Sequence, residues 1–383
     1  MKKRIYLFII SLLIINVNFA QKIAICLFYT NSINTIVITP TFGSYTVSSD
    51  NQIISKLLKN EILYISEYQD SINIRGIKKN YGNFKNILIY QNEEEGSFRI
   101  KPIYPSLDAR NYLGNLQIKS LKNKLQIVNR INIEDYISGV VETEGGAKAK
   151  LEYYKSQAII CRTYLIGHLR RHEEENFHLC DGVHCQAYKS KCSHNLEIVS
   201  STNSTKNLII VDENNLPITA SFHSNCGGET VNSENVWTYP KKYLKSIIDT
   251  FCTDHNHSIW ADSVQINNWI NYLVENNFKI RTDINLKKLN FEQNQRKLFY
   301  VLNEDTISLK KIRADFGFKS TFFNIRTEGE KVYFDGKGYG HGVGLCQEGA
   351  MKMAVLGKNY SEIIEKYYRN ISIREIDETI DGL

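Results

Sequence analysis

The part of the sequence with the clearest chemical potential is a stretch rich in cysteine and histidine. It contains His178, Cys180, His184, Cys185, Cys192 and His194. Two thiolates and two imidazoles can surround zinc in a closed tetrahedral shell, which is structural because it leaves no position for a reacting water. We expect the ligands to be His178, Cys180, His184 and Cys185, with Cys192 and His194 as substitutes for one of them. A disulfide between two of these cysteines is the alternative, since exported proteins commonly form disulfides.

Two glycine-rich loops carry further histidines. His223 lies in the segment 222–230 and His341 in the segment 338–350. Glycine allows the backbone to come close to a ligand, so these loops are candidates for lining a binding groove. The second loop lacks the lysine and the strand-to-helix spacing of a nucleotide-binding loop, which argues against a phosphate site.

The other five cysteines give weaker signals. Cys26 and Cys161 have apolar neighbours, which predicts simple burial. Cys226 and Cys346 lie within the two glycine-rich motifs, and Cys252 has no predicted role.

The elements that must position these residues follow from the hydrophobic pattern. Residues 22–133 alternate apolar and polar side chains in short runs separated by Gly, Asn, Asp and Ser, which predicts β-strands. Residues 137–141 are also expected as a strand. Apolar residues repeat at spacings of three and four between residues 151 and 169, which predicts a helix. Further helices are expected at about 263–275 and 361–368. The predicted fold class is α+β, with a mostly β N-terminal part that leads into a mixed α/β region containing a groove.

Residues 1–20 have a basic start, an apolar stretch and Ala20 at the end, as is typical of a secretory signal peptide. We therefore expect engagement of the secretion machinery, cleavage near Ala20, and an exported protein that is periplasmic or associated with the cell wall. An uncleaved membrane anchor is the alternative. Removing the three basic residues of this segment lowers the formal net charge from +6 to +3. This small, evenly spread charge argues against nucleic acid as a partner.

Four sequence blocks occur in order between about Arg110 and Tyr368. They are 132–144 with 152–164; 180–188; 222–230 with 236–237 and 243–244; and 338–350. Together they resemble the stage II sporulation protein D (SpoIID/LytB) family, and four ordered blocks are far more specific than any single one.

The resemblance implies a lytic transglycosylase that acts on the glycan strands of peptidoglycan with one catalytic glutamate and, in some members, a zinc bound by Cys and His. It implies a β-rich region at 21–109, a catalytic domain at 110–372 and a tail at 373–383. The family usually has Pro at the position of Glu142, Met-Pro at Gly145-Gly146 and a small residue such as Ser at Cys346. These departures concern loop geometry and rate more than reaction class.

Glu144 is the expected general acid and base. Glycosidic cleavage needs a proton on the leaving oxygen and a nucleophile at the anomeric carbon. A muramyl sugar carries its own nucleophile, the hydroxyl at carbon six, so one glutamate suffices. Partial burial would raise its pKa and keep it protonated near neutral pH. Glu142 is the rival on the same face of the expected strand, and Glu152 is expected to stabilise the first helical turn.

The resemblance and the residue types also suggest a set of substrate-binding residues. They are Gln157, Arg162, Tyr188, His223, Tyr339, His341 and Gln347, with Trp237 as a further stacking candidate. Gln157 and Arg162 project about 140° apart on a helix, so at most one can point squarely into a cleft. For Arg162 the alternative is a helix-surface residue, and for the aromatic residues it is burial in the core.

Three other functions remain open at this stage. One is a catalytically weak, zinc-stabilised peptidoglycan-binding module. Another is a peptidase that uses Cys346 with His341. The third is a hydrolytic muramidase, in which Asp135 or Glu142 would be the second carboxylate. The expected partners are glycan strands, with or without stem peptides, and an amidase.

Overall fold

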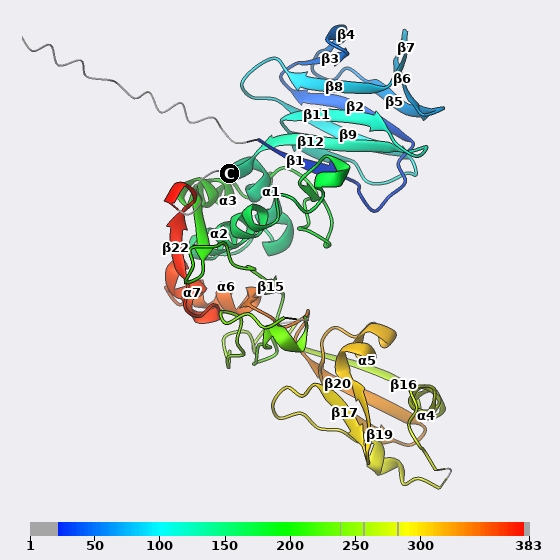
Figure 1. Ribbon diagram of the computed structural model, residues 1–383, viewed down its shortest axis with the longest axis vertical. Helices are drawn as coiled ribbons and strands as arrows, with labels where there is room; N and C mark the ends of the chain where they lie inside the picture. The colour runs from blue at the N-terminus through cyan, green and yellow to red at the C-terminus, as the bar shows by residue number, and fades with distance from the viewer. Residues whose placement is uncertain (1–21, 238, 256, 282, 379–383) are drawn as a thin grey trace, which may run out of the picture.

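The computed structural model describes residues 22–237, 239–255, 257–281 and 283–378, which form three parts stacked along the long axis of the molecule (Figure 1). The expected signal peptide lies outside the described residues. Within the described residues, no helix has the length and apolar character needed to cross a membrane.

The upper part consists of two mainly antiparallel β-sheets whose buried side chains share one core. The seven-stranded sheet has the order β13 (Leu179–Cys180), β1 (Lys22–Leu27), β12 (Leu125–Asn132), β11 (Asn115–Ser120), β8 (Asn86–Gln91), β3 (Tyr45–Ser49) and β4 (Gln52–Leu57), with β13 parallel to β1. The six-stranded sheet has the order β10 (Arg110–Leu113), β9 (Ser97–Tyr104), β2 (Thr35–Phe42), β5 (Leu63–Tyr68), β6 (Ser71–Gly76) and β7 (Asn80–Phe84). Alternate residues such as Ile72 and Ile74 are buried, which is the period-two pattern of the sequence.

The expected domain boundary near residue 110 falls inside these sheets. Strand β10 pairs with β9, and β12 pairs with both β11 and β1. The β-rich part therefore extends to Asn132, because its first strand needs β12 as a hydrogen-bonding neighbour. The expected tail likewise begins inside strand β22 (Ser372–Glu375), which pairs with β14 (Leu208–Val211).

The middle part is mainly helical. It contains α1 (Ile133–Gly145), α2 (Leu151–Gly167), α3 (Leu196–Ser204), α6 (Gln347–Val355) and α7 (Tyr360–Tyr367), with the short parallel pair β15 (Phe222–His223) and β21 (Leu345–Cys346). The helices predicted at 151–169 and 361–368 are confirmed as α2 and α7. The buried side chains of this part belong to the same core as those of the sheets.

The expected strand at 137–141 is wrong, because these residues lie inside α1. The β-branched residues suggested a strand, but Ile133, Tyr136, Ile137 and Val140 are buried at helical spacing. Asn132 begins the helix by accepting a hydrogen bond from the backbone N–H of Glu134 at 2.8 Å. Residues two apart on a helix project about 200° apart, so Glu142 and Glu144 do not share a face.

The lower part, residues 259–337, has a hydrophobic core of its own, to which Trp269, Tyr300 and Phe334 belong. It contains β16 (Ile259–Gln265), α4 (Ile266–Glu275), β17 (Phe299–Leu302), β18 (Asp305–Ser308), α5 (Leu309–Phe316), β19 (Phe322–Glu328) and β20 (Lys331–Lys337). The helix expected at 263–275 begins at Ile266, because the preceding residues extend β16. The chain enters and leaves this lobe side by side, as the Gly338 N–H donates to the Ser258 carbonyl at 2.9 Å. We call residues 259–337 the inserted lobe.

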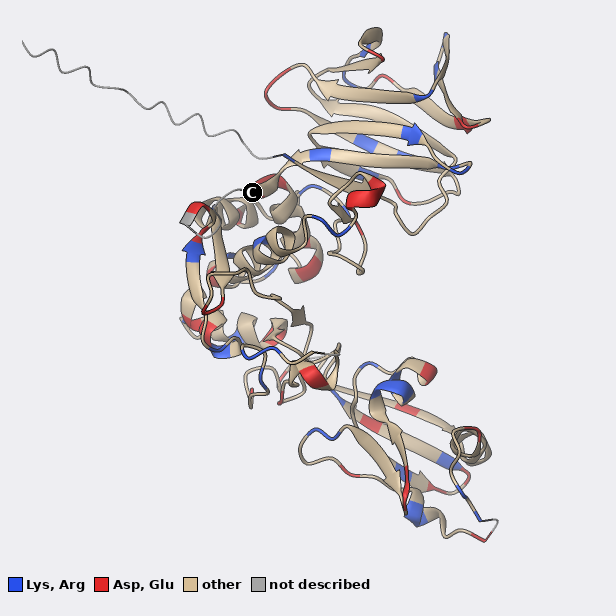
Figure 2. Ribbon diagram, in the orientation of Figure 1, with Lys and Arg blue, Asp and Glu red and all other residues tan. Residues whose placement is uncertain are grey.

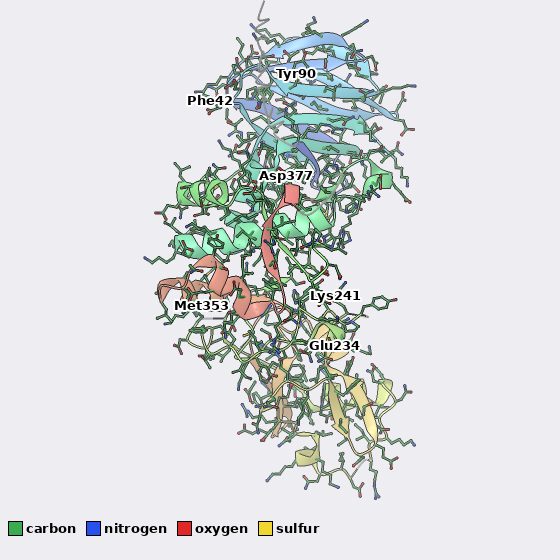
Figure 3. All side chains as sticks on the ribbon, turned by 60° about the vertical axis from the view of Figure 1, so that its left-hand side comes forward. Phe42, Tyr90, Glu234, Lys241, Met353 and Asp377 are labelled. Atoms are coloured by element: carbon green, nitrogen blue, oxygen red, sulfur yellow. The ribbon has the colours of Figure 1, made fainter. Side chains whose placement is uncertain are left out.

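Basic and acidic residues are both present in all three parts, without a large region of one sign (Figure 2). A view turned by 60° shows the same arrangement, with Phe42 and Tyr90 on the β part, Met353 on the helical part and Glu234 near the junction with the inserted lobe (Figure 3).

Candidate functional site

Glu144 lies in the last turn of α1, where the helix ends at Gly145. Its side chain is half-buried, and its Oε1 accepts a hydrogen bond from the backbone N–H of Ala187 at 2.8 Å. Burial raises the pKa of Glu144 above its usual value of 4.5, against the smaller opposite effects of the Ala187 N–H and of Lys189. The carboxyl therefore stays protonated to higher pH than an exposed glutamate, as a general acid requires.

Gln347 lies directly beside Glu144, although the two are far apart in sequence. It is the first residue of α6, and its Nε2 donates to the backbone carbonyl of Glu144 at 3.2 Å. This contact ties the end of α1 to the start of α6. The structure thus places one of the predicted substrate-binding residues next to the candidate acid.

The two glycines after Glu144 have different roles. A Cβ at Gly145 would lie 2.7 Å from the hydroxyl of Tyr153, so only glycine fits there. Gly146 ends α1 with a positive φ of 69°, and a Cβ there would meet nothing within 4 Å. Gly146 is exposed, so the chain reaches the surface directly after the end of α1.

Of the two rival carboxylates, Glu142 is hydrogen-bonded to another segment and Asp135 is distant from Glu144. Glu142 accepts hydrogen bonds from the backbone N–H groups of Ser193, His194 and Asn195 at 2.8 to 3.2 Å, and its pKa is lowered by these bonds against the opposing effect of burial. Asp135 lies at the other end of α1, about 14 Å from Glu144 along the helix axis at 1.5 Å per residue.

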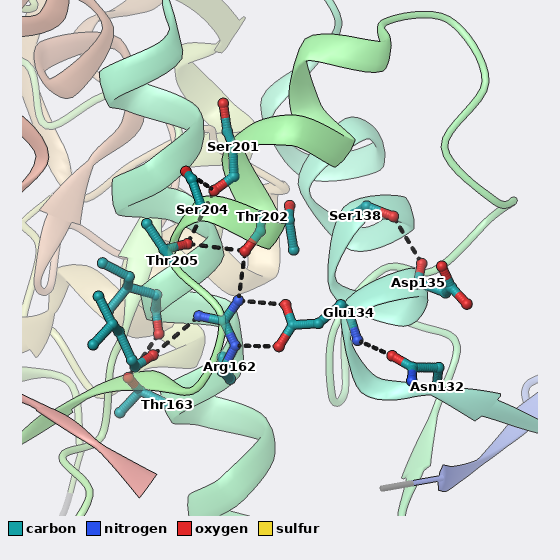
Figure 4. Close-up of polar contacts among 12 residues, drawn as sticks. Asn132, Glu134, Asp135, Ser138, Arg162, Thr163, Ser201, Thr202, Ser204 and Thr205 are labelled. Carbon is teal, nitrogen blue, oxygen red and sulfur yellow. Dashed lines mark hydrogen bonds and ion pairs between the residues drawn. The ribbon is translucent and has the colours of Figure 1, made fainter. Parts of the chain in front are cut away.

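Arg162 is not a substrate-binding residue in this structure. It is fully buried, and its Nε and Nη2 bind both carboxylate oxygens of Glu134 at 3.0 and 2.5 Å (Figure 4). Its Nη1 donates to the carbonyl of Leu208 and its Nη2 to that of Thr202, at 3.0 and 3.3 Å. The guanidinium therefore joins α1, α3 and β14. A buried ion pair differs from both sequence-based expectations for Arg162, a substrate-binding residue and a helix-surface residue.

Gln157 and Tyr188 are also enclosed. Gln157 has no exposed surface and donates to the sulfur of Cys161 at 3.5 Å. Tyr188 is buried between Tyr112 and Tyr136, with ring centroids 5.4 and 5.0 Å away. Both side chains are packed in the core and expose no surface to a ligand, in contrast to the expected role in substrate binding.

The remaining predicted residues gather near the inserted lobe. The His341 ring lies between those of His223 and Trp237, with centroids 5.5 and 5.8 Å away. His341 lines a cavity of about 340 Å³ that also includes Arg296 and Arg313. Burial lowers the pKa of His341 to about 4, so the imidazole is neutral at neutral pH. The exposed Tyr339 lies outside the residues that line this cavity.

The cysteine and histidine side chains form a compact candidate metal centre. The ligand atoms of His172, Cys180, His184 and Cys185 all lie within 4.8 Å of one another. The sulfur of Cys185 is 3.5 Å from Nε2 of His172 and 3.6 Å from Nδ1 of His184. This set of two thiols and two imidazoles matches a closed tetrahedral zinc site. All eight cysteines are among the described residues, and the structure has none of them joined in a disulfide.

The candidate group contains His172 in the place where the sequence suggested His178. The Nδ1 atom of His178 accepts a hydrogen bond from the Ala24 N–H at 3.1 Å, which ties this residue to β1. The Nδ1 atom of His172 binds Glu175 at 2.7 Å and leaves Nε2 facing Cys185, an arrangement in which a carboxylate orients a metal-binding imidazole. His172 lies before the start of the Cys/His stretch, so the composition of that stretch gives no signal for it.

The loop that carries these ligands is anchored to the β part. Strand β13 places Cys180 beside Cys26 of β1, and Asp181 accepts hydrogen bonds from the Phe28 and Tyr29 N–H groups at 2.7 and 3.2 Å. Cys192, the predicted substitute ligand, instead donates its thiol to Glu142 at 3.2 Å. His194 is absent from the two groups of metal-ligand type in the described residues.

Comparison with known proteins identifies a family and several relatives of this chain. The family model described as "Stage II sporulation protein" matches residues 121–211, which include α1, α2 and the candidate metal centre. An uncharacterised protein of Brachyspira hyodysenteriae is 26% identical over 88% of this chain and 89% of its own. The amidase enhancer of Bacillus subtilis is 29% identical over 75% of this chain and 47% of its own. Stage II sporulation protein D of Bacillus subtilis is 30% identical over 66% of this chain and 77% of its own. On this similarity, the chain belongs to the stage II sporulation protein D family.

Proposed function

We propose that this protein is an exported lytic transglycosylase. It would cut the bond between MurNAc and GlcNAc in peptidoglycan strands and leave 1,6-anhydroMurNAc ends. The observation that carries the proposal is the half-buried carboxyl of Glu144, with a raised pKa and one oxygen held by the Ala187 N–H.

The chemistry follows from this arrangement. Ala187 holds Oε1, so Oε2 is the oxygen that carries the proton. As the bond between the anomeric carbon and the leaving oxygen breaks, Glu144 gives this proton to the leaving oxygen. The hydroxyl at carbon six of the same sugar then bonds to the anomeric carbon and returns its proton to Glu144. Atoms and charge balance without water, and the glutamate ends in its starting form.

The positions of the other carboxylates favour this reaction over hydrolysis. A two-carboxylate hydrolase needs its second acid about 5 to 9.5 Å from the first. Asp135 is about 14 Å away along α1. Glu142 projects from a different side of the helix and is engaged by three backbone N–H groups. Neither rival is therefore positioned to activate a water molecule at a sugar held by Glu144.

Family membership and the relatives support a role in the cell wall. One relative is named an amidase enhancer, which favours cooperation with an amidase that removes stem peptides. Zinc bound by His172, Cys180, His184 and Cys185 would be structural, because the protein fills all four positions. Such an ion would fix the loop that precedes Ala187, whose N–H holds Glu144.

Product analysis tests the proposal. Purified glycan strands, with and without stem peptides, are incubated with the wild-type protein and with the Glu144→Gln variant. The masses of the products are then determined by mass spectrometry. We expect anhydro ends from wild type and none from Glu144→Gln, whereas Asp135→Asn and Glu142→Gln should still yield anhydro ends. Reducing ends that have gained a water would refute the transglycosylase mechanism.

The binding-module alternative gains support from the burial of Gln157, Arg162 and Tyr188, which removes three expected substrate contacts. A module of this kind would sediment with insoluble peptidoglycan and release no products. The same incubation therefore separates the two functions.

A further inference from the structure

A second group of metal-ligand type lies outside the Cys/His stretch. The ligand atoms of Cys226, Asp249, Cys252 and Cys346 all lie within 4.8 Å of one another, and all four residues are fully buried. Cys226 follows β15, Cys346 ends β21, and Asp249 and Cys252 belong to the loop that leads to the inserted lobe. Three separate segments thus deliver three sulfurs and a carboxylate to one point in the core.

The spacing of these atoms suits a tetrahedral ion. The sulfurs of Cys226 and Cys252 are 3.3 Å apart, and the Cys226 sulfur is 3.4 Å from Oδ2 of Asp249. Zinc–sulfur bonds of about 2.3 Å and zinc–oxygen bonds of about 2.0 Å separate tetrahedral ligands by about 3.8 Å for two sulfurs and 3.5 Å for sulfur and oxygen. A disulfide would need the two sulfurs at about 2.05 Å. Small side-chain movements therefore suffice for metal binding.

The carboxylate is already oriented by its surroundings. The Tyr367 hydroxyl donates to Oδ2 of Asp249 at 2.8 Å, and the Phe251 N–H donates to Oδ1 at 3.1 Å. A Cβ at Gly349 would lie 2.5 Å from the same Oδ2, so glycine leaves the space that the carboxylate fills. Hydrogen bonds of this kind fix the orientation of metal ligands.

Burial of the Asp249 carboxylate is energetically unfavourable unless a cation compensates its charge. A carboxylate removed from water is destabilised unless it is paired or coordinates a metal. The nearby Arg296 does not pair with it, because its Nη2 donates to the Cys226 carbonyl and its backbone N–H and Nε bind Glu229. A divalent ion would supply the missing charge and replace the thiol protons.

We propose that Cys226, Asp249, Cys252 and Cys346 form a second zinc site. Three thiolates exclude the oxygen-preferring cations Ca²⁺ and Mg²⁺ and select a soft or borderline metal. Four protein ligands close the shell, so the site is structural. The proposal does not depend on cleavage of glycan.

The position of this site suggests its structural role. Cys226 and Cys252 precede the inserted lobe in sequence, and Cys346 follows it, so the ion joins the two ends of the insertion. Cys346 is also the N-cap of α6 and precedes Gln347, which donates to the Glu144 carbonyl. An ion at Cys346 therefore fixes the start of α6 against the end of α1, and Gln347 becomes a positioning residue for Glu144.

Metal content tests the proposal on the full chain. Wild-type protein, exported and purified without chelators, should contain two zinc ions per chain when its metal content is measured by inductively coupled plasma mass spectrometry. The Cys180→Ser/Cys185→Ser variant should retain one, Cys252→Ser should also retain one, and the matched control Cys161→Ser should keep two. Cobalt substituted into the Cys180→Ser/Cys185→Ser variant should give intense thiolate-to-cobalt absorption, which Cys252→Ser added to that variant should abolish.

Three results would overturn the proposal. One is a Cys180→Ser/Cys185→Ser chain that folds, as judged by circular dichroism, and contains no zinc. Another is a Cys252→Ser chain with as much zinc as wild type. The third is a Cys226–Cys252 disulfide in the unreduced wild-type peptide map. This last measurement uses the native protein and so does not depend on whether any variant folds.

Discussion

Replacement of Arg162 by Met should destabilise the protein strongly. The guanidinium is fully buried and donates twice to the Glu134 carboxylate and once each to the carbonyls of Leu208 and Thr202. Methionine fills much of the same volume but donates nothing, so the Glu134 carboxylate stays in the core without a cation. Breaking one side of a buried ion pair costs about 3 to 5 kcal/mol, a large fraction of the roughly 5 to 15 kcal/mol that stabilises a typical domain.

The free energy of unfolding should be measured by urea denaturation followed by far-ultraviolet circular dichroism. Trp269 belongs to the core of the inserted lobe and Trp260 packs against it, so tryptophan fluorescence reports chiefly on that lobe and is an internal control. The double variant Glu134→Leu/Arg162→Met should lose less free energy than the sum of the single variants, because it leaves no unpaired charge.

The opposite pattern would refute this reasoning. If Arg162→Met unfolds within about 1 kcal/mol of wild type, the ion pair does not hold α1, α3 and β14 together. If that variant also binds glycan more weakly, Arg162 is a substrate-binding residue after all.

Three further predictions concern the two sites. The cleavage rate should fall as the pH rises through the raised pKa of Glu144, because the carboxyl loses the proton that it must donate. A pH–rate profile whose falling limb is centred at or below pH 4.5 would contradict the proposed effect of burial on this pKa. Replacement of Gln347 by Ala removes its hydrogen bond to the Glu144 carbonyl, so the free energy of unfolding should fall by about 1 kcal/mol, and kcat should fall while KM stays unchanged if Gln347 positions Glu144. His172→Ala should lose one zinc per chain and His178→Ala none, as measured by metal analysis, and the reverse result would restore His178 as the ligand.

Local patterns in the sequence were sufficient for much of the fold. The alternation in residues 22–133 predicted the strands, and the apolar spacing after residue 151 predicted α2, because both patterns report which face of an element is buried. The same method failed at 137–141, where a short apolar run rich in β-branched residues satisfies either period. Only the N-cap at Asn132 and the packing of α1 on α2 resolve it.

The sequence by itself determined the family, the α+β class, and the identity of Glu144 as the candidate acid, because these depend on residue types and order along the chain. Only the tertiary structure decided which side chains meet. The fold places His172, and not His178, beside Cys180, Cys185 and His184. It pairs the buried Arg162 with Glu134 and brings Cys252 beside Cys226 and Cys346. The physical reason is that a ligand set or an ion pair depends on distances of a few ångströms between segments far apart in sequence, which no local pattern encodes.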